Sequence, residues 1–197
     1  MTKFSKLALC AIILGGFSFF TSCNNDDDKP ATPVKASIYT RLGGTTKTQD
    51  PRAASGIMIE KGRLAFRSVV DTTINLIVAD IQAGASGNLG AHFAPIVGEV
   101  VSGNASNVAV LSKDLTDFFS ANTGGGASNT YTGLDMVSAH DPAKNPRMGT
   151  KSNDADYSKF EGYVGMAANK NNVASNTELY TDVVAVLESL RTQIVQK

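Results

Sequence analysis

The sequence predicts an all-α protein with long loops, and two observations carry this prediction. Apolar residues recur at spacings of three and four in four separate segments, which is the pattern of helices with one buried face. Glycine-rich stretches separate these segments, and the alternating pattern that is typical of strands is scarce. The part concerned spans about 160 residues, the size of one domain.

The chain begins with the features of a secretory signal peptide, residues 1–22. Lys3 and Lys6 precede an apolar run over 7–20 that is too short to cross a bilayer of about 30 Å. Small residues then lead to Cys23, as at a cleavage point. The segment resembles a lipoprotein signal in which Cys23 becomes lipidated. An ordinary signal peptide with an incidental cysteine is the alternative.

Residues 23–36 are expected to form a solvated tether. Three consecutive aspartates and two prolines, with Val34 as the one large apolar residue, cannot build a core. An acidic run after a lipidated cysteine resembles the surface-export signal of Bacteroidetes-type lipoproteins, although a plain spacer would have the same composition. We therefore expect a protein anchored to the cell envelope through Cys23, at the outer membrane, with surface exposure left open.

The remaining composition excludes several classes of function. Cys10 leaves with the signal peptide and Cys23 carries lipid, so neither a disulfide nor a thiolate site is expected. Removing Lys3 and Lys6 leaves 18 − 2 = 16 basic residues against 18 acidic ones, which argues against nucleic acid as a partner. The motifs of zinc sites, serine hydrolases and phosphate-binding loops do not occur.

Four helices are expected in the folded domain, residues 37–197. The third begins at about Asp154, and the fourth begins at Ser175, because Ser175 and Glu178 have the spacing of a capping box. The apolar stripes are Phe66, Val69, Val70, Thr73, Ile74 and Ile77; Val108, Leu111, Leu115, Phe118 and Phe119; Tyr157, Phe160, Val164, Ala167 and Ala168; and Leu179, Val183, Val186, Leu187, Leu190 and Ile194. Loops are expected over 84–90, 123–130 and 141–153, and long loops in compact domains are often functional.

His92 and His140 are the only histidines in the chain, and so the only candidates for an imidazole ligand. A lone histidine is more often structural or exposed than a ligand. Met136, however, lies one helical turn before His140, which places both side chains on one face. A soft apolar side chain beside an imidazole suits a flat apolar ring that lies against both.

The segment 131–140, YTGLDMVSAH, resembles the proximal signature of truncated haemoglobins, chiefly their group I. Further blocks resemble the same family in the same order: IYTRLGG at 38–44, VVD at 69–71 with VAD at 78–80, FFSANTGG at 118–125, NDADY at 153–157, and the last helix at 178–195. The resemblance covers residues 37–196. It implies a truncated, two-on-two globin-like helical sandwich with long loop insertions.

This resemblance implies a protein that binds haem b and a small diatomic ligand, which is oxygen, nitric oxide or carbon monoxide. His140 would be the iron ligand, with its other ring nitrogen donating to a nearby carbonyl group. Met136 would lie on the proximal haem face and Phe93 on the distal face. The other residues that the resemblance assigns to the haem pocket are Leu111, Leu115, Phe118, Phe119 and Tyr157.

The usual distal hydrogen-bond donors of the family are missing. Thr73 and Ile74 stand where the family has Phe-Tyr, and Leu115 stands where it usually has glutamine. A hydrogen bond to the bound ligand is worth roughly 1.5–3 kcal/mol, so its loss would speed oxygen release by about one to two orders of magnitude. Thr73 would be a partial substitute, unless its hydroxyl bonds to its own helix backbone.

Inserted residues also set the chain apart from the family. They follow the LGG block over 45–64, flank His92 and Phe93, and lengthen the loop after His140. His92 is either a second axial ligand or an exposed loop residue. The basic residues of the later loop are either partners of the haem propionates or solvated cations; they are Lys144, Arg147 and Lys151.

Three functions remain open at this stage. The first is a haem globin that handles a diatomic ligand; turnover as a nitric oxide dioxygenase or peroxidase-like enzyme would need an outside electron donor or reductase. The second is a surface haem carrier that exchanges haem with a donor or acceptor protein. The third is a structural lipoprotein that has a globin shape but binds no haem. The absence of the usual distal donors is consistent with this third function.

Overall fold

A computed structural model describes residues 34–87 and 89–197. The expected signal peptide, Cys23 and most of the expected tether lie outside the described residues, so the predictions about them stay predictions. Residues Lys35–Lys197 form one compact unit. In this part of the chain, no helix combines the length and the apolar character needed to cross a membrane.

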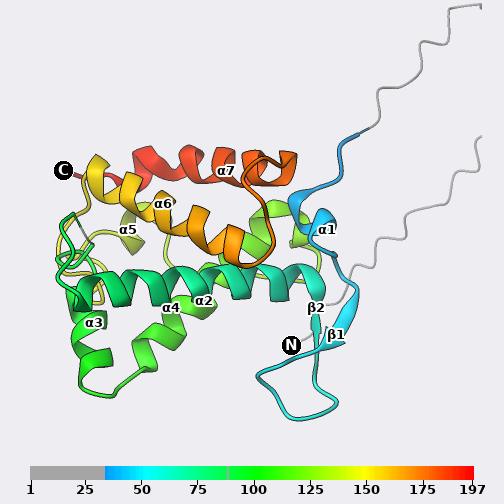
Figure 1. Cartoon of the computed structure of the whole chain (residues 1–197), viewed down its shortest axis with the longest axis horizontal. Coiled ribbons are helices and arrows are strands. Elements are labelled where there is room, and N and C mark those ends of the chain that lie inside the picture. The colour runs from blue at the N-terminus through cyan, green and yellow to red at the C-terminus, as the bar shows by residue number, and fades with distance from the viewer. Residues whose placement is uncertain (1–33, 88) are drawn as a thin grey trace, which may run out of the picture. The chain divides into compact units, whose positions relative to one another are not determined.

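The described residues are mostly helical, as predicted, and the four expected helices are all present (Figure 1). They are α2, α4, α6 and α7 in the full order of elements. That order is α1 Ile38–Arg41, β1 Lys47–Gln49, β2 Met58–Glu60, α2 Lys61–Gln82, α3 Ala94–Val101, α4 Ser106–Ser120, η1 Ala121–Gly125, α5 Met136–Ala139, α6 Asp154–Lys170 and α7 Glu178–Ile194.

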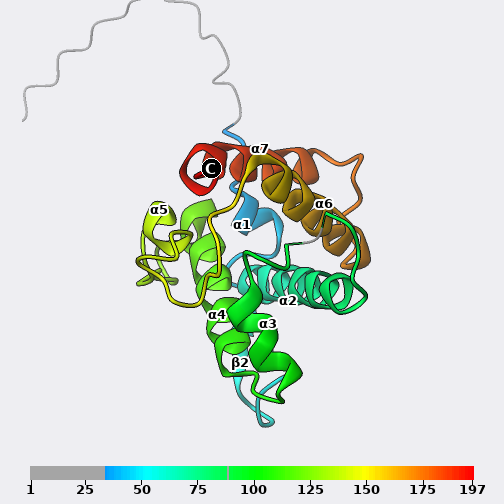
Figure 2. The same ribbon diagram turned by 90° about the vertical axis from the view of Figure 1, so that its left-hand side faces the viewer.

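Helix α2 is the centre of the unit. It packs against α4 on one side and α6 on the other, and α6 packs in turn against α7 (Figures 1 and 2). Near one end of α2, the rings of Tyr39, Phe66 and Phe119 stack in series and join α1, α2 and α4. Near the other end, Ile77 and Tyr163 form a second buried cluster. The predicted apolar stripes of α2, α6 and α7 therefore contribute buried residues to the core. In α4 the buried residues are polar, and of its predicted stripe only Phe119 packs against a core cluster.

Helix α7 begins later than predicted. Its N-cap is Thr177, whose hydroxyl accepts from the backbone N–H of Tyr180 at 3.2 Å, so the capping box expected at Ser175 is wrong. The N–H of Thr177 is itself bonded to the carbonyl of Ala174 in a turn. Because Ser175 lies within that turn, it cannot serve as the first cap of the helix.

Helix α6 begins at Asp154, as predicted, and this helix has the capping box. The Asn153 side chain accepts from the backbone N–H of Asp156 at 2.8 Å, and the Asp156 carboxylate accepts from the N–H of Asn153 at 2.9 Å. This reciprocal pair satisfies two N–H groups that a helix start otherwise leaves free. It fixes the position at which the chain enters α6 from the long preceding loop.

The insertion after the LGG block contains an antiparallel hairpin that the sequence pattern did not predict. Strands β1 and β2 pair Lys47 with Glu60 and Gln49 with Met58. Each strand has only three residues, too few for an alternating pattern to be recognised. Arg67 of α2 holds the hairpin through two bonds to Asp50, at 2.6 and 2.9 Å.

The insertion after Phe93 contains a helix as well. Helix α3 spans Ala94–Val101 and has Pro95 in its first turn, where the missing N–H of proline costs nothing. The segment is apolar on most of its surface and has only eight residues, so its helical period is hard to recognise. Helix α3 contacts α4 and so extends the wall of helices next to Phe93.

Candidate functional site

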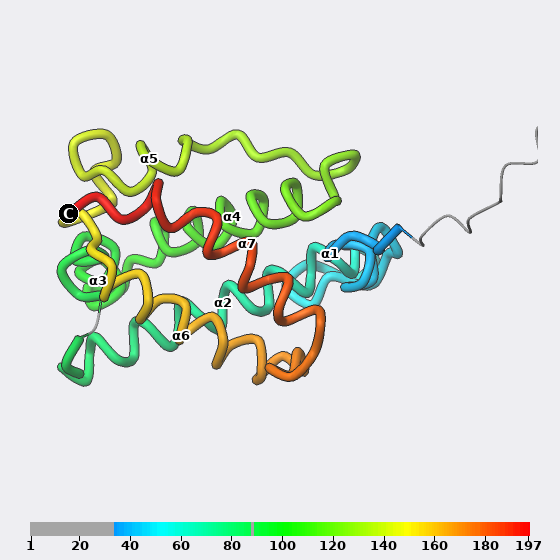
Figure 3. The backbone as a smooth tube through the Cα atoms, turned by 90° about the horizontal axis from the view of Figure 1, so that it is seen from above, coloured from blue at the N-terminus to red at the C-terminus, as the bar shows by residue number. Residues whose placement is uncertain are grey.

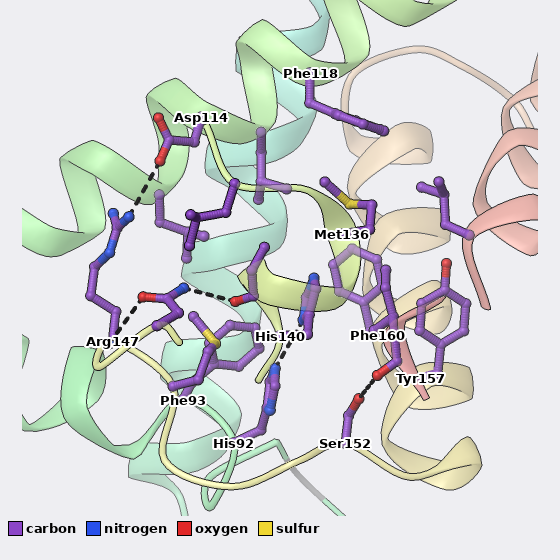
Figure 4. Close-up of a pocket in the computed structure, with 18 of the residues that line it drawn as sticks. His92, Phe93, Asp114, Phe118, Met136, His140, Arg147, Ser152, Tyr157 and Phe160 are labelled. Carbon is purple, nitrogen blue, oxygen red and sulfur yellow. Dashed lines mark hydrogen bonds and ion pairs between the residues drawn. The ribbon is translucent and has the colours of Figure 1, made fainter. Parts of the chain in front are cut away.

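A largely apolar pocket lies between α4 on one side and α5, α6 and α7 on the other (Figure 4). Its enclosed volume is about 100 Å³, below the roughly 300–1000 Å³ that is usual for cofactor pockets, and the free space grows to about 1010 Å³ when the open solvent at its mouth is included. A large cofactor would therefore extend into the open mouth. All eight residues that the resemblance assigns to a cofactor line this one space. They are Phe93, Leu111, Leu115, Phe118, Phe119, Met136, His140 and Tyr157.

Further apolar residues complete the lining, although the sequence did not assign them to a site. Four of the nine come from helix faces predicted as core, and Met148 comes from the loop before α6. Met148 is buried. A large apolar residue in a mainly polar loop is the sequence feature that could have marked it as a buried residue. The added residues are Leu89, Ile96, Leu134, Ala139, Met148, Phe160, Leu187, Leu190 and Ile194.

Several polar side chains of the lining already bind protein groups. The hydroxyl of Tyr157 donates to the carbonyl of Leu187 at 2.6 Å. The hydroxyl of Tyr131 donates to the carbonyl of Leu134 at 2.5 Å. Ser152 and Asn145 likewise donate to backbone carbonyls, at 2.6 and 2.7 Å. These donors are used in holding the walls together, so they are not free for a ligand in the pocket.

Helix α5 positions His140 at the pocket. Asp135 caps the helix, because its carboxylate accepts from the N–H of Ser138 at 3.0 Å. The helix ends after Ala139, and His140 follows as its C-cap residue. Near the C-terminus, Gln196 donates to the carbonyl of Val137 at 2.7 Å, which ties α5 to the end of α7 (Figure 3). A short helix that would be unstable alone is therefore fixed at both ends.

The two histidines form a hydrogen-bonded pair. Nδ1 of His140 lies 3.2 Å from Nε2 of His92, and the two rings are nearly parallel, at 6°. On the other side of the pair, Nδ1 of His92 lies 2.5 Å from the carbonyl oxygen of Thr150. Figure 4 shows the two labelled rings joined by this contact, with the second nitrogen of His140 directed away from His92.

Burial favours the neutral form of both rings. Loss of hydration, together with a smaller effect of its neighbour His92, lowers the pKa of His140 to about 4. Burial also lowers the pKa of His92, against an opposing effect of the hydrogen bond to Thr150. At neutral pH each ring therefore has one N–H group and one nitrogen lone pair.

The position of His92 differs from both interpretations of the sequence. It is only 4% exposed, so the exposed loop residue is wrong. Its Nε2 faces His140 at hydrogen-bond distance, instead of facing His140 across the pocket as a second axial ligand would. We expected the second ring nitrogen of His140 to donate to a backbone carbonyl. That nitrogen contacts the ring of His92 instead, and it is the His92 ring that contacts the carbonyl of Thr150. The two histidines are 48 residues apart, and no sequence pattern relates them.

Nε2 of His140 has no hydrogen-bonding partner among the described residues. It belongs to a residue of intermediate exposure that lines the pocket. An imidazole nitrogen of this kind is a good ligand for a transition metal. The described residues contain no group of three or more His, Cys, Asp or Glu side chains that could hold a metal ion. A metal at Nε2 would therefore need most of its ligands from a cofactor.

The two residues that stand where the family has Phe-Tyr do not reach the pocket, so Thr73 is not a substitute donor there. Thr73 and Ile74 are buried in α2, and neither lines the pocket. The hydroxyl of Thr73 donates to the carbonyl of Val69, in its own helix, at 2.9 Å. Leu111 and Leu115 line the pocket from α4 and offer no hydrogen bond.

Of the three basic loop residues, only Arg147 lines the pocket. Its guanidinium lies 3.5 Å from the carboxylate of Asp114 on α4, as Figure 4 shows. Lys151 lies 4.0 Å from Asp141, and Lys144 is exposed. Arg147 is thus the one of the three that a negatively charged ligand in the pocket would meet.

A scan against protein-family models found no match for this chain, and a search of curated proteins found none either. The resemblance to truncated haemoglobins therefore rests on the sequence motifs quoted above alone.

Proposed function

We propose that this protein binds haem b in the pocket, with Nε2 of His140 as the axial iron ligand, and that it handles a small diatomic ligand such as oxygen, nitric oxide or carbon monoxide. One observation carries the proposal. An imidazole nitrogen without a protein partner faces an apolar pocket, while the opposite nitrogen of the same ring is held by a hydrogen bond. The lone pair of such a nitrogen is available to a metal ion from outside the chain.

The lining suits a flat apolar ring with charged groups at one edge. The side chains of Phe93, Leu115, Phe118 and Met136 provide apolar surface for the faces of the ring. Arg147 provides a cation for its carboxylates and can exchange Asp114 for them. Bound haem would supply an iron atom that can bind the diatomic ligand.

The helix packing supports a truncated globin fold for this site. Helix α2 packs with α4, α6 packs with α7, and the α2–α6 contact joins the two pairs. We assign these pairs to the two layers of a two-on-two helical sandwich. The hairpin, α3 and the long loop before α6 are then insertions on that framework. In cells the protein would be anchored through lipidated Cys23 at the outer membrane.

A haem carrier is the second candidate, and the distal wall favours it. Leu111 and Leu115 cannot donate to bound oxygen, and the hydroxyl of Tyr131 is already bonded to a backbone carbonyl. Oxygen would therefore leave quickly, which suits transfer of haem better than storage of oxygen. Rapid loss of haem to apomyoglobin would favour the carrier, and retention over hours would favour the ligand-handling globin.

Reconstitution tests the proposal. The full chain, purified in detergent without haem, is titrated with haemin, and the expected result is a saturable 1:1 Soret band. His140→Ala should lose or shift this band, and added imidazole should restore it by replacing the missing ligand. Val137→Ala is the matched control, because Val137 is an exposed neighbour in α5. A wild-type chain that stays colourless, or a His140→Ala spectrum equal to that of wild type, would refute the proposal.

A further inference from the structure

We propose that His92 is a positioning residue for His140: it accepts the Nδ1–H of His140 and thereby fixes the tautomer and orientation that direct a lone pair at Nε2 into the pocket. The use of that lone pair for haem depends on the function proposed above. The tautomer itself is a property of the protein without cofactor, and it can be measured separately.

The carbonyl group of Thr150 determines the direction of both hydrogen bonds of the histidine pair. A backbone carbonyl can only accept, so the 2.5 Å contact with Thr150 requires a proton on Nδ1 of His92. In a neutral ring, Nε2 of His92 then has a lone pair and no proton. The 3.2 Å contact with His140 is a hydrogen bond only if His140 donates from Nδ1.

The opposite tautomer of His140 would be unfavourable. With its proton on Nε2, its Nδ1 lone pair would face the lone pair of His92 at 3.2 Å. Two acceptors in a buried place would then lack a donor. Leaving buried groups unsatisfied in this way shifts the tautomer ratio by about tenfold or more.

The loop after α5 holds His92 in place. The backbone N–H of Gly149 donates to the carbonyl of His92 at 2.7 Å, next to the bond between Thr150 and the His92 ring. A side chain at Gly149 would collide with the carbonyl oxygen of Ala91, so this close approach requires glycine. Phe93 packs edge-on against the His92 ring, at 4.8 Å between ring centres. The backbone and the ring of His92 are therefore both fixed.

The arrangement has a consequence for any metal bound at Nε2. An imidazole that donates from one nitrogen is a stronger ligand at the other, and its orientation is fixed. Loss of such a supporting partner typically weakens metal binding by about 10–100-fold. We expect the same range for the effect of His92 on haem retention.

The first measurement uses the full chain without haem, in detergent and labelled with ¹⁵N. Because the chain has only two histidines, long-range ¹H–¹⁵N spectra of the rings contain two spin systems, which the variants assign. The expected result for wild type at neutral pH is two neutral rings, both protonated at Nδ1. A His140 ring protonated at Nε2 in wild type would overturn the proposal, whatever the variants do.

Three variants separate a positioning role from simple packing. His92→Phe keeps a ring but removes the acceptor, and should shift the His140 tautomer ratio about tenfold toward Nε2–H. His92→Gln offers an amide oxygen in place of Nε2, and should restore part of the wild-type ratio. Val137→Ala shortens an exposed side chain of α5 without touching the hydrogen bonds of either ring, and should leave the ratio unchanged. Equal ratios in wild type and His92→Phe would overturn the proposal.

Haem-loaded protein gives an independent measurement. The stretching frequency of the bond between ferrous iron and histidine, from resonance Raman spectra, should fall in His92→Phe and recover in His92→Gln, and haem loss should be about 10–100-fold faster in His92→Phe. If wild type binds no haem, the proposed function fails while the tautomer result still decides the role of His92. If haem binds but neither the frequency nor the tautomer responds to His92, this inference alone fails.

Discussion

The substitution Glu60→Gln should destabilise the protein at neutral pH and remove part of its sensitivity to acid. Glu60 ends the inserted hairpin and is only 7% exposed. One of its oxygens accepts from Tyr39, from Ser128 at 2.8 Å and from Asn129 at 3.1 Å. Lys47 donates to the other oxygen at 3.2 Å. A glutamine would place an NH₂ group among these donors, because it can accept through only one atom.

The size of the effect follows from these contacts. Hydrogen bonds to a charged group contribute roughly 1.5–3 kcal/mol each, and a glutamine retains some of them, so we expect a loss of about 2–3 kcal/mol at neutral pH. For a domain of this size, that loss lowers the melting temperature by about 4–12 °C. If Glu60→Gln only loosened the attachment of the hairpin, the loss of unfolding free energy would be smaller than this.

The pH dependence has a definite sign. The hydrogen bond from Tyr39 is the main cause that lowers the pKa of Glu60 from 4.5 to about 2. A lowered pKa means that the carboxylate stabilises the folded state above pH 4.5 and that this stabilisation is lost as the pH falls toward 2. The full shift corresponds to about 3 kcal/mol, and screening at the exposed Lys47 reduces it to about 1–2 kcal/mol.

Urea unfolding of wild type and variant, followed by circular dichroism from neutral pH down to about pH 3, measures both effects. The difference in unfolding free energy between wild type and Glu60→Gln should decrease as the pH falls. Glu188→Gln is the control, because Glu188 is an exposed carboxylate whose partner is Arg191, and its unfolding midpoint should stay close to that of wild type. If Glu60→Gln unfolds at the wild-type urea concentration, or this difference does not change with pH, the reasoning is wrong.

Three further predictions concern the pocket and its loop. Leu115→Gln places a donor on the distal wall and should slow oxygen release about 10–100-fold in flow or flash photolysis; an unchanged rate would contradict the proposed ligand position. Arg147→Ala should speed haem transfer to apomyoglobin several-fold while Arg147→Lys does so less, and equal rates for all three proteins would exclude a carboxylate contact. Gly149→Ala should cost about 1–3 kcal/mol in urea unfolding because its side chain meets Ala91, whereas Gly162→Ala, with open space around it in α6, should gain about 0.4–1 kcal/mol; similar values for the two would contradict the close approach at Gly149.

The sequence predicts the long helices, which carry an apolar stripe. It does not predict the short strands or the exact start of α7. Helices α2, α4, α6 and α7 each repeat that stripe over several turns, so their period is unmistakable. The start of α7 is less certain from sequence, because Ser175 and Thr177 are both good capping residues and only the turn before the helix decides between them. The three-residue strands and the short α3 lie below the length at which a period can be recognised.

The same distinction applies to the site. The cofactor residues named from the resemblance line one pocket because most of them lie on the predicted helices, at spacings that put them on inner faces. His92 was misassigned because its partner, His140, is 48 residues away and follows α3, α4, η1 and α5 in the chain. Hydrogen-bond direction depends on that long-range contact, and a pattern confined to neighbouring residues contains no information about it.

The loop between α5 and α6 links His92 to the C-terminal end of the chain and to α5. As an insertion it was unexplained, yet it supplies Gly149 and Thr150 to His92 on one side. On the other side Ser152 of the same loop donates to the carbonyl of Ile194 at 2.6 Å and accepts from Gln196 at 3.0 Å. Gln196 in turn bonds to α5, so the loop, the C-terminus and α5 form a closed set of contacts around His140. A loop that only filled space would not need a glycine pressed against the backbone next to His92. We therefore interpret the insertion as the part of the chain that holds His92 against the ring of His140.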